Sequence, residues 1–341
     1  MKTITLGSTG ITTVQNAFGA LPIQRISQAE ACALVRRAYE AGINYFDTAN
    51  AYTDSEEKLG EALHDVRQNV VISTKSGGKD KKTVLAHIEQ SLRSLRTDYI
   101  DLFQFHNPAV LPDPNDPDGP FAAALEMQKK GYIRHIGITN HRMKVAREAI
   151  DSGLYETLQF PFCYLASEEE VALVRLCQEK DLGFIAMKGL SGGLLNNAEA
   201  CYAFMRQYPN VVPIWGIQHE WELDQWLELS RRDPAMTPEL QAVIERDRSE
   251  LAGNFCRSCG YCLPCTAGID IPQSARMSAL LRRSPYQPYM SKEWYEKMHR
   301  IEECVHCDAC KSRCPYGLDI PNLLVKMLAD YDAFYAQHHG E

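Results

Sequence analysis

Eight of the twelve cysteines in this 341-residue chain stand in two runs near its C-terminal end, and this pattern constrains the fold more than any other feature. The first run consists of Cys256, Cys259, Cys262 and Cys265. The second consists of Cys304, Cys307, Cys310 and Cys314, has the spacing C-x2-C-x2-C-x3-C-P and ends on Pro315. A similar tail follows each run, GIDIP at 268–272 and GLDIP at 317–321. The chain therefore contains an internal repeat built around thiol ligands.

The spacing of the second run is the one with which bacterial proteins hold [4Fe–4S] clusters, and its fourth cysteine ligates the other of two clusters. Two runs therefore predict two [4Fe–4S] clusters. Exchange of the fourth cysteine assigns one cluster to Cys256, Cys259, Cys262 and Cys314. It assigns the other to Cys304, Cys307, Cys310 and Cys265. The first run is irregular, because two residues rather than three precede its last cysteine and Thr266 replaces the expected proline.

Other uses of these cysteines fit less well. Zinc ribbons use pairs of C-x2-C with four thiolates for each ion, which gives no reason for two runs of four. Disulfides suit secreted chains, and this sequence starts MKTIT without an apolar signal segment. We therefore expect a reducing, cytoplasmic location, with the scattered cysteines in or near the core: Cys32, Cys163, Cys177 and Cys201.

The gross composition excludes two classes of partner. A net charge of −8 with no basic tract gives no reason to expect a nucleic-acid partner. No apolar run approaches the roughly 18 residues that a membrane-spanning helix needs. The content of 45% hydrophobic and 23% charged residues is typical of a soluble globular protein.

The N-terminal two thirds of the chain alternates between strand and helix patterns. Residues 1–15 predict a short hairpin, with turn residues at 7–10. Eight candidate strands follow, at 16–20, 43–48, 70–75, 99–106, 133–139, 157–163, 183–188 and 211–216. Most are continuous apolar runs, which is typical of strands buried on both faces. This α/β pattern predicts a (β/α)8 TIM barrel, with a doubly wound open sheet as the alternative.

The composition shifts to Arg, Asp and Pro around 231–238, which marks a domain boundary. We therefore predict a barrel over 1–240, a small, mainly helical ferredoxin-like iron–sulfur domain over 250–330, and a tail over 331–341. Helical segments are expected in this second domain at 272–283, 292–303 and 321–337.

Four polar residues follow predicted strands, where barrel enzymes place their chemistry. They are Asp47, Tyr52, Lys75 and His106. A buried lysine is costly unless it is paired, and a lysine beside a tyrosine stabilises the phenolate and makes the phenol a usable proton donor. A structural ion pair with a core histidine is the alternative interpretation.

Several motifs resemble those of the aldo-keto reductase family over about residues 1–220. They are FDTANAY (46–52), EEKLGEAL (56–63), STK (73–75), DLFQFHN (101–107), IRHIGITN (133–140) and IAMKGLSGG (185–193). The cysteine repeat resembles the ferredoxin-type domain fused behind a subgroup of these reductases. The resemblance implies NAD(P)-dependent reduction of a small-molecule carbonyl, or oxidation of an alcohol.

The resemblance also implies roles for individual residues. Tyr52 would donate the proton, Lys75 and Asp47 would tune it, and His106 would orient the carbonyl. The nicotinamide carboxamide would be held by Thr139, Asn140 and Gln159, and its ring would stack on Phe162. The backbone of 190–194 would approach the pyrophosphate, through Leu190, Gly192 and Leu194.

One segment departs from the family pattern. Members of the family usually offer a basic residue and a serine to the 2′-phosphate of NADP after the last strand, whereas this chain reads GIQHEWE at 216–222. The choice between NADP and NAD therefore stays open.

Two functions remain at this point. In the first, the protein is an oxidoreductase whose clusters exchange single electrons with a redox partner protein or a second substrate. A hydride carries two electrons and each cluster one, and the sequence shows no group that joins the two. In the alternative, it is a redox-sensing or regulatory binding module whose clusters are structural.

Overall fold

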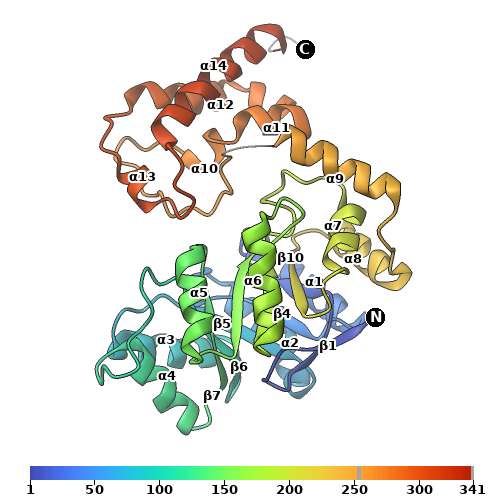
Figure 1. Ribbon diagram of the computed structural model, residues 1–341, viewed down its shortest axis with the longest axis vertical. Coiled ribbons are helices and arrows are strands. Elements are labelled where there is room, and N and C mark those ends of the chain that lie inside the picture. The colour runs from blue at the N-terminus through green and yellow to red at the C-terminus, as the bar shows by residue number, and fades with distance from the viewer. Residues whose placement is uncertain (252–254, 339–341) are drawn as a thin grey trace. The chain divides into compact units, whose positions relative to one another are not determined.

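A closed barrel of eight parallel strands forms within residues 1–251 and 255–338, which this computed structural model describes (Figure 1). The strand order around the barrel is β10-β3-β4-β5-β6-β7-β8-β9. The strands are β3 (Ala17–Gly19), β4 (Tyr45–Asp47), β5 (Val71–Ser76), β6 (Ile100–His106), β7 (Ile133–Thr139), β8 (Thr157–Pro161), β9 (Gly183–Met187) and β10 (Val211–Gly216). The predicted barrel is confirmed, and closure between β10 and β3 excludes the open-sheet alternative.

The predicted N-terminal hairpin consists of β1 (Thr3–Thr5) and β2 (Thr12–Val14), which pair antiparallel with Thr3 opposite Val14. The side-chain oxygen of Asn44, just before β4, accepts hydrogen bonds from the Thr13 hydroxyl at 2.9 Å and the Val14 amide at 3.0 Å. These contacts tie the hairpin to the amino-terminal side of β4, away from the strand ends that carry the polar residues.

Helices connect successive barrel strands, and one more follows the last strand. The connecting helices are α1 (Gln28–Glu40), α2 (Ser55–Leu63), α3 (Lys81–Ser94), α4 (Pro120–Lys129), α5 (Met143–Ser152), α6 (Glu168–Glu179) and α7 (Ala198–Met205), and α8 (Glu220–Arg232) follows β10. Capping boxes of Ser27 with Glu30 and of Ser167 with Glu170 start α1 and α6. Gly153 ends α5 in a left-handed conformation, as expected of a C-terminal glycine.

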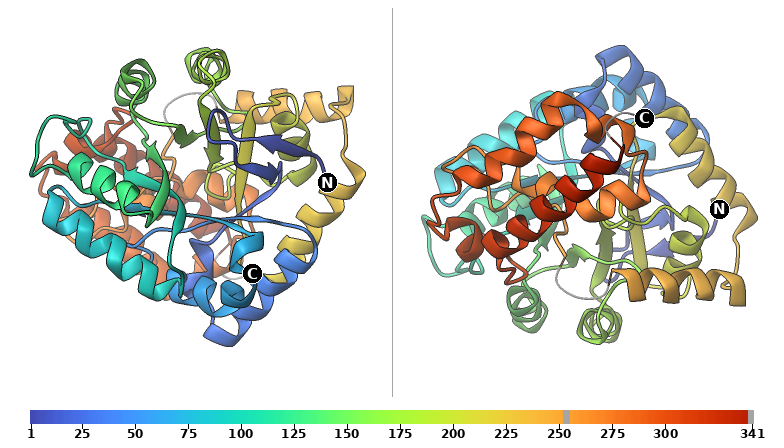
Figure 2. Two further views of the ribbon diagram at one scale, coloured as in Figure 1. Left: turned by 90° about the horizontal axis from the view of Figure 1, so that it is seen from below. Right: turned by 90° about the horizontal axis from the view of Figure 1, so that it is seen from above.

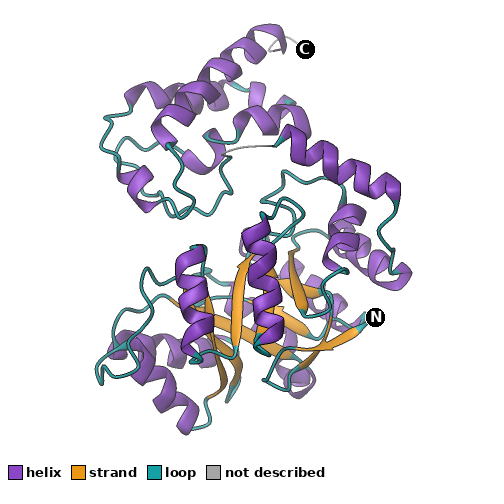
Figure 3. Cartoon of the chain, viewed as in Figure 1, coloured by secondary structure: helices purple, strands orange, loops and turns teal. Residues whose placement is uncertain are grey.

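The chain divides by its contacts into two units. The first contains Met1–Gly189 and Asn197–Gln241, and the second contains Leu190–Asn196 and Ala242–Glu341. Helices and loops make up the described part of the second unit (Figure 3). Its helices are α9 (Pro238–Glu250), which begins just before the boundary, α10 (Ile271–Ser274), α11 (Met277–Arg283), α12 (Lys292–His299), α13 (Ala309–Arg313) and α14 (Ile320–His338).

The second unit has its own hydrophobic core. Helix α14 packs against α10, α11, α12 and α13, and the two views of Figure 2 show it crossing them. Met277, Met298 and Tyr331 are fully buried at the centre, and the Tyr331 hydroxyl donates to the Tyr289 carbonyl at 2.7 Å. None of the described helices is long and apolar enough to cross a membrane.

The second unit differs from the sequence prediction in three respects. The division by contacts places Leu190–Asn196 with the C-terminal residues, whereas the predicted boundary left that segment in the barrel. The helix predicted over 272–283 is two, because Arg276 is not helical (φ −120°, ψ 2°) and starts α11 as its N-cap. Residues 331–338 are not a tail, since α14 continues through them, while 339–341 lie outside the described residues.

Candidate active site and cluster cysteines

A buried ion pair stands at the carboxyl ends of β4 and β5. The Lys75 ammonium lies 2.6 Å from Asp47 Oδ1 and donates to the Thr48 carbonyl at 2.6 Å. Both side chains are at most 4% exposed. Burial lowers the pKa of Lys75, and the charge of Asp47 opposes that shift. A buried charge of this kind is retained only because its partner and hydrogen bonds are in place.

Tyr52 and His106 stand next to this pair. Tyr52 lies in the turn between β4 and α2, and its ring centroid is 5.5 Å from Lys75 Nζ. The His106 ring meets the Tyr52 ring edge-on, with centroids 5.9 Å apart. The structure therefore brings all four predicted polar residues together at one end of the barrel.

The protonation state of His106 follows from its surroundings. Burial, and then the charge of Lys75, lower the pKa of His106 to about 3. The imidazole is therefore neutral at physiological pH and can donate one hydrogen bond from a ring nitrogen.

Two residues that the sequence analysis missed contact the carboxylate of Asp47. The Ser73 hydroxyl donates to Asp47 Oδ2 at 2.5 Å, and the Gln104 amide lies 3.5 Å from the same oxygen. Each precedes a predicted site residue by two positions, Ser73 before Lys75 and Gln104 before His106. Alternate residues of a strand point to the same face, so this spacing was a usable signal.

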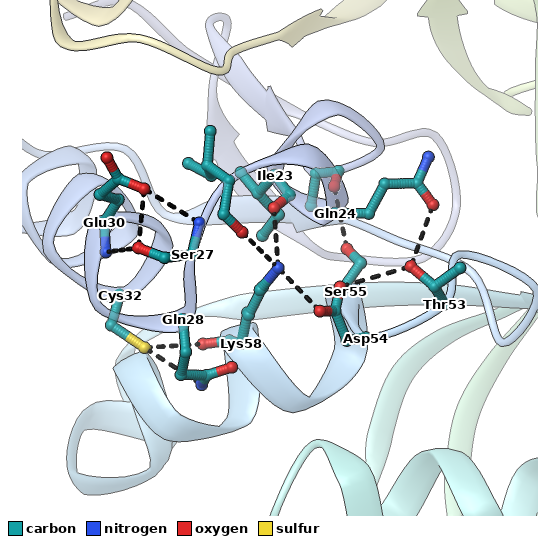
Figure 4. Close-up of polar contacts among 12 residues, drawn as sticks. Ile23, Gln24, Ser27, Gln28, Glu30, Cys32, Thr53, Asp54, Ser55 and Lys58 are labelled. Atoms are coloured by element: carbon teal, nitrogen blue, oxygen red, sulfur yellow. Dashed lines mark hydrogen bonds and ion pairs between the residues drawn. The ribbon is translucent and has the colours of Figure 1, made fainter.

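A second buried lysine fixes the loops around Tyr52 (Figure 4). Lys58 of α2 donates to the carbonyls of Ile23 at 3.0 Å and Ile26 at 2.8 Å, and pairs with Asp54 at 2.8 Å. The Ser55 hydroxyl donates to the Ala20 carbonyl at 2.9 Å. The loop after β3 and the turn that carries Tyr52 are thereby held to one another.

The residues expected to hold a nicotinamide lie on neighbouring strands. In the barrel register Thr139 pairs with His106 on one side and with Gln159 on the other. The Gln159 oxygen accepts from the Gln104 amide at 2.8 Å. The Asn140 side chain is engaged: its amide donates to the Pro108 carbonyl at 2.8 Å, and its oxygen accepts from the next two backbone amides.

The prediction that Phe162 stacks on a nicotinamide ring is not supported. Its side chain is only 2% exposed and packs against Phe184, Phe204 and Tyr208, with ring centroids 5.0 to 5.8 Å apart. In this arrangement the Phe162 side chain is almost completely covered by other side chains. Met187, at the end of β9, lies nearer the expected place, because its sulfur is 3.9 Å from the Thr139 hydroxyl.

The segment after β10 is already occupied by a carboxylate of the chain. Glu222 Oε2 accepts from the backbone amides of Gln218 at 2.7 Å and His219 at 2.9 Å, at the start of α8. These amides are the groups that would otherwise attract an anion to a helix N-terminus. With both amides engaged by Glu222, and with Glu220 nearby, this segment is unfavourable for a phosphate.

Cysteines of the two runs lie near one another. Cys265, Cys304, Cys307 and Cys310 line one small cavity, which Cys262 also borders. Burial, and to a smaller extent the charges of Cys304 and Cys265, raise the pKa of Cys310, while burial with the charges of Cys259 and Cys314 raises the pKa of Cys256. The proximity of Cys265 to the second run and of Cys314 to the first is compatible with the crossed sets, which stay a prediction.

Among the described residues, no three His, Cys, Asp or Glu side chains converge closely enough to chelate one metal ion. Burial, and then the charges of Cys256 and Cys259, raise the pKa of Cys262 to about 12, so a bound cation would have to stabilise its thiolate. Thr266, at the irregular position of the first run, lies 3.8 Å from Cys307 Sγ.

A closed parallel barrel with acid–base residues at the carboxyl ends of its strands is an enzyme architecture. Comparison with protein families identifies which one. Residues 3–229 match the aldo/keto reductase family, and residues 255–319 match the 4Fe-4S dicluster domain. The chain therefore belongs to the aldo/keto reductase family and carries a fused 4Fe-4S dicluster domain, as predicted.

The chain is also similar in sequence to individual proteins. The chain is 28% identical over 180 residues to the uncharacterized oxidoreductase YqkF of Bacillus subtilis (49% of this chain, 58% of YqkF). It is 26% identical over 243 residues to the aldo-keto reductase AFTS1 of Alternaria alternata (56% and 65%). It is 29% identical over 210 residues to L-galactose dehydrogenase of Arabidopsis thaliana (56% and 66%). The matches thus cover less than two thirds of each relative's length.

Solved structures share the barrel. Aldo-keto reductase AKR11C1 of Bacillus halodurans, in its holo form, superposes with a TM-score of 0.64 at 22% identity, covering 72% of this chain and 96% of that one. The Bombyx mori aldo-keto reductase AKR2E4 in complex with NADP gives a TM-score of 0.58 at 20% identity, covering 72% and 92%. At these identities the likeness establishes the fold alone.

Proposed function

We propose that this protein catalyses the NAD(P)H-dependent reduction of a small-molecule carbonyl, or the reverse oxidation of an alcohol, with Tyr52 as the proton donor. One observation carries the proposal. The Lys75 ammonium, buried in an ion pair with Asp47, lies 5.5 Å from the centre of the Tyr52 ring. The neutral His106 ring meets the Tyr52 ring edge-on.

Each side chain has a defined task in this reaction. A bound nicotinamide would supply a hydride to the carbonyl carbon. Tyr52 would give its phenolic proton to the carbonyl oxygen, and the Lys75 ammonium stabilises the phenolate that remains. The neutral imidazole of His106 donates a hydrogen bond that orients the carbonyl oxygen. Asp47 keeps Lys75 protonated in spite of its burial.

NADH is the better fit of the two reduced cofactors. The amides of Gln218 and His219 are taken by Glu222, and the side chain of Glu220 is 74% exposed and lies 3.8 Å from Arg37. A 2′-phosphate at this segment would therefore meet the carboxylates of Glu222 and Glu220. Thr139 and Gln159 are the side chains that would hold the carboxamide.

The second unit would hold two [4Fe–4S] clusters with the crossed cysteine sets given above, which support single-electron exchange with a redox partner protein. Cys314→Ser tests the crossing. Loss of the cluster held by the first run, with iron and sulfide falling to about half, is expected, whereas loss confined to the second run's cluster would refute it.

The catalytic assignment is tested by Tyr52→Phe, with Tyr155→Phe as the matched control. The Tyr155 hydroxyl is buried and has no hydrogen-bond partner among the described residues, so its removal leaves the site unchanged. We expect kcat for NADH-dependent reduction of 4-nitrobenzaldehyde to fall at least a hundredfold in Tyr52→Phe only. Wild-type activity in Tyr52→Phe would refute the role of Tyr52.

A regulatory module with structural clusters is the second candidate, and the engaged side chain of Asn140 and the capped amides at 218–219 favour it. Anaerobic titration with NADH and NADPH separates the two. Bleaching of the cluster absorbance supports electron relay, and binding without bleaching supports structural clusters. A chain that bound neither nucleotide would favour the module.

A further inference from the structure

The segment Leu190–Asn196 groups by its contacts with a different unit from the one that its place in the chain suggests. In chain order it follows β9 and precedes α7, so it belongs to the barrel's βα loops. Its contacts nevertheless group it with Ala242–Glu341. The change occurs just after Gly189, which packs so tightly on Trp215 that an added Cβ would lie 2.5 Å from the indole ring.

Two arginines hold this segment by its backbone. Arg276 Nη1 donates to the Gly192 carbonyl at 2.5 Å, and Arg283 Nη1 donates to the Leu194 carbonyl at 3.0 Å. The Asn196 amide lies 3.5 Å from the Arg283 carbonyl. Each of these three contacts involves α11 or its N-cap residue.

Both arginines are themselves fixed. Arg283 pairs with Asp247 at 2.6 Å and Glu250 at 2.8 Å on α9, and the side chain of Asp247 is completely buried. Arg276 donates through Nε to the Pro272 carbonyl at 3.0 Å and through Nη2 to Gln273 at 3.1 Å. Because their charges and donors are used in this way, the arginines serve as backbone clamps rather than as an anion site of their own.

The clamped segment is a tight turn in which the amides of Gly193 and Leu195 donate to the Leu190 carbonyl, at 2.9 and 3.2 Å. Ser191, Gly192 and Gly193 are consecutive residues in the left-handed region, with φ of 49°, 68° and 91°. Residues held in such conformations persist only where the surroundings fix them. Successive amides in turns that include left-handed residues form concave sites that bind anions such as phosphates.

The clamp also connects the segment to the first cysteine run. A Cβ on Gly192 would lie 3.5 Å from Ser258 Cβ and 3.8 Å from the Arg257 carbonyl, the two residues that follow Cys256. The Ser258 amide donates to Cys256 Sγ at 3.4 Å. The tightest turn of the segment therefore rests on the part of the chain that would hold the first cluster.

We infer that Arg276 and Arg283 are positioning residues through which the iron–sulfur unit holds Leu190–Asn196 in the conformation that binds the diphosphate of a dinucleotide. This inference rests on the proposed function, because it takes a nicotinamide dinucleotide as the ligand.

The test measures the binding of the diphosphate part and the reaction of the nicotinamide part of the dinucleotide in separate assays. Anaerobically purified Arg276→Gln, Arg283→Gln and the control Arg282→Gln are compared with the wild type. Arg282 is the neighbouring arginine, half exposed and paired with Asp330 instead of the segment. The Kd of ADP-ribose, which carries the diphosphate, is measured by calorimetry, and turnover of 4-nitrobenzaldehyde is measured with reduced nicotinamide mononucleotide, which lacks it.

We expect the Kd of ADP-ribose to rise about tenfold or more in the two clamp variants, as the loss of a charge-assisted hydrogen bond predicts. It should stay within twofold in Arg282→Gln, and kcat/KM with the mononucleotide should stay within twofold in all variants. An unchanged Kd in both clamp variants would overturn the inference while leaving the proposed function intact. A wild type that neither binds NADH nor turns over the aldehyde would instead refute the proposed function.

Arg283→Lys covers the case in which the glutamine variants lose their clusters. Lysine keeps the positive charge opposite the buried Asp247, but it lacks the second terminal nitrogen with which Arg283 also donates to the Leu194 carbonyl. Its cluster absorbance should match the wild type while the Kd of ADP-ribose still rises severalfold. Intact clusters with a wild-type Kd would count against the clamp.

Discussion

Replacing Lys75 by methionine probes the proton donor most sharply, because it removes the cation beside Tyr52 and keeps the side-chain volume. Lys75 Nζ lies 5.5 Å from the centre of the Tyr52 ring. At an effective dielectric constant of about 20, Coulomb's law gives about 3 kcal/mol of stabilisation for a phenolate at that separation. Proton donation should slow accordingly, by up to about a hundredfold.

The same change leaves Asp47 buried without its partner. Stranding one charge of a buried pair costs about 3–5 kcal/mol of stability, so Lys75→Met alone confounds folding with catalysis. The double variant Asp47→Asn/Lys75→Met removes the stranded charge and serves as the control. It should recover most of the lost unfolding free energy but not the lost rate.

The assay is single-turnover reduction of 4-nitrobenzaldehyde by saturating NADH, with urea unfolding of the same samples. A hundredfold loss of rate in both variants, with stability recovered only in the double variant, is the expected result. Recovery of the rate in the double variant would show that Lys75 acts only by holding the fold. The electrostatic argument would then be wrong.

Three further predictions concern other residues. The pKa of His106 lies at about 3 instead of its usual 6.5, so kcat should show no histidine inflection between pH 5 and 8. Between pH 6.5 and about 3 the histidine gains its proton only in the unfolded chain, so the free energy of unfolding falls as the pH falls. At pH 5.5 this loss is up to about 1.4 kcal/mol. His106→Gln should not show the loss when urea titrations at pH 7.5 and 5.5 are compared. Glu222→Gln should raise the affinity for NADPH relative to NADH severalfold by removing the negative charge that lies against the amides at 218–219, whereas the equally charged change Glu220→Gln should have a smaller effect; equal ratios in both variants would contradict the reasoning. Phe162→Ala should cost about 3–5 kcal/mol of unfolding free energy as a core truncation and leave the Kd of NADH unchanged, and a large rise in that Kd without loss of stability would restore Phe162 as the stacking residue.

The strand order and the acid–base residues could be predicted because both depend on local patterns. Continuous apolar runs separated by capped helices define parallel strands, and the carboxyl end of each strand locates Asp47, Lys75 and His106 without knowledge of the packing. The hairpin and the two cysteine sets follow from turn residues and ligand spacing in the same way.

The remaining features depend on contacts between residues distant in sequence. Phe162 was assigned to the cofactor through the resemblance to the family, but whether an aromatic ring faces a site or the core is decided by its neighbours, here Phe204 and Tyr208 of the α7 region. The break at Arg276 was also invisible, because no proline or glycine marks it. Its cause is tertiary, since the side chain leaves the helix surface to reach Gly192.

The most direct test of carbonyl reduction by this site follows the transferred hydrogen. Reduction of 4-nitrobenzaldehyde with NADH deuterated at nicotinamide C4 should give an alcohol with one deuterium on the carbinol carbon, at a rate that falls at least a hundredfold in Tyr52→Phe. Electrons delivered through the clusters would instead leave that carbon with hydrogen from solvent. An unlabelled alcohol, or undiminished label transfer in Tyr52→Phe, would contradict the proposed function.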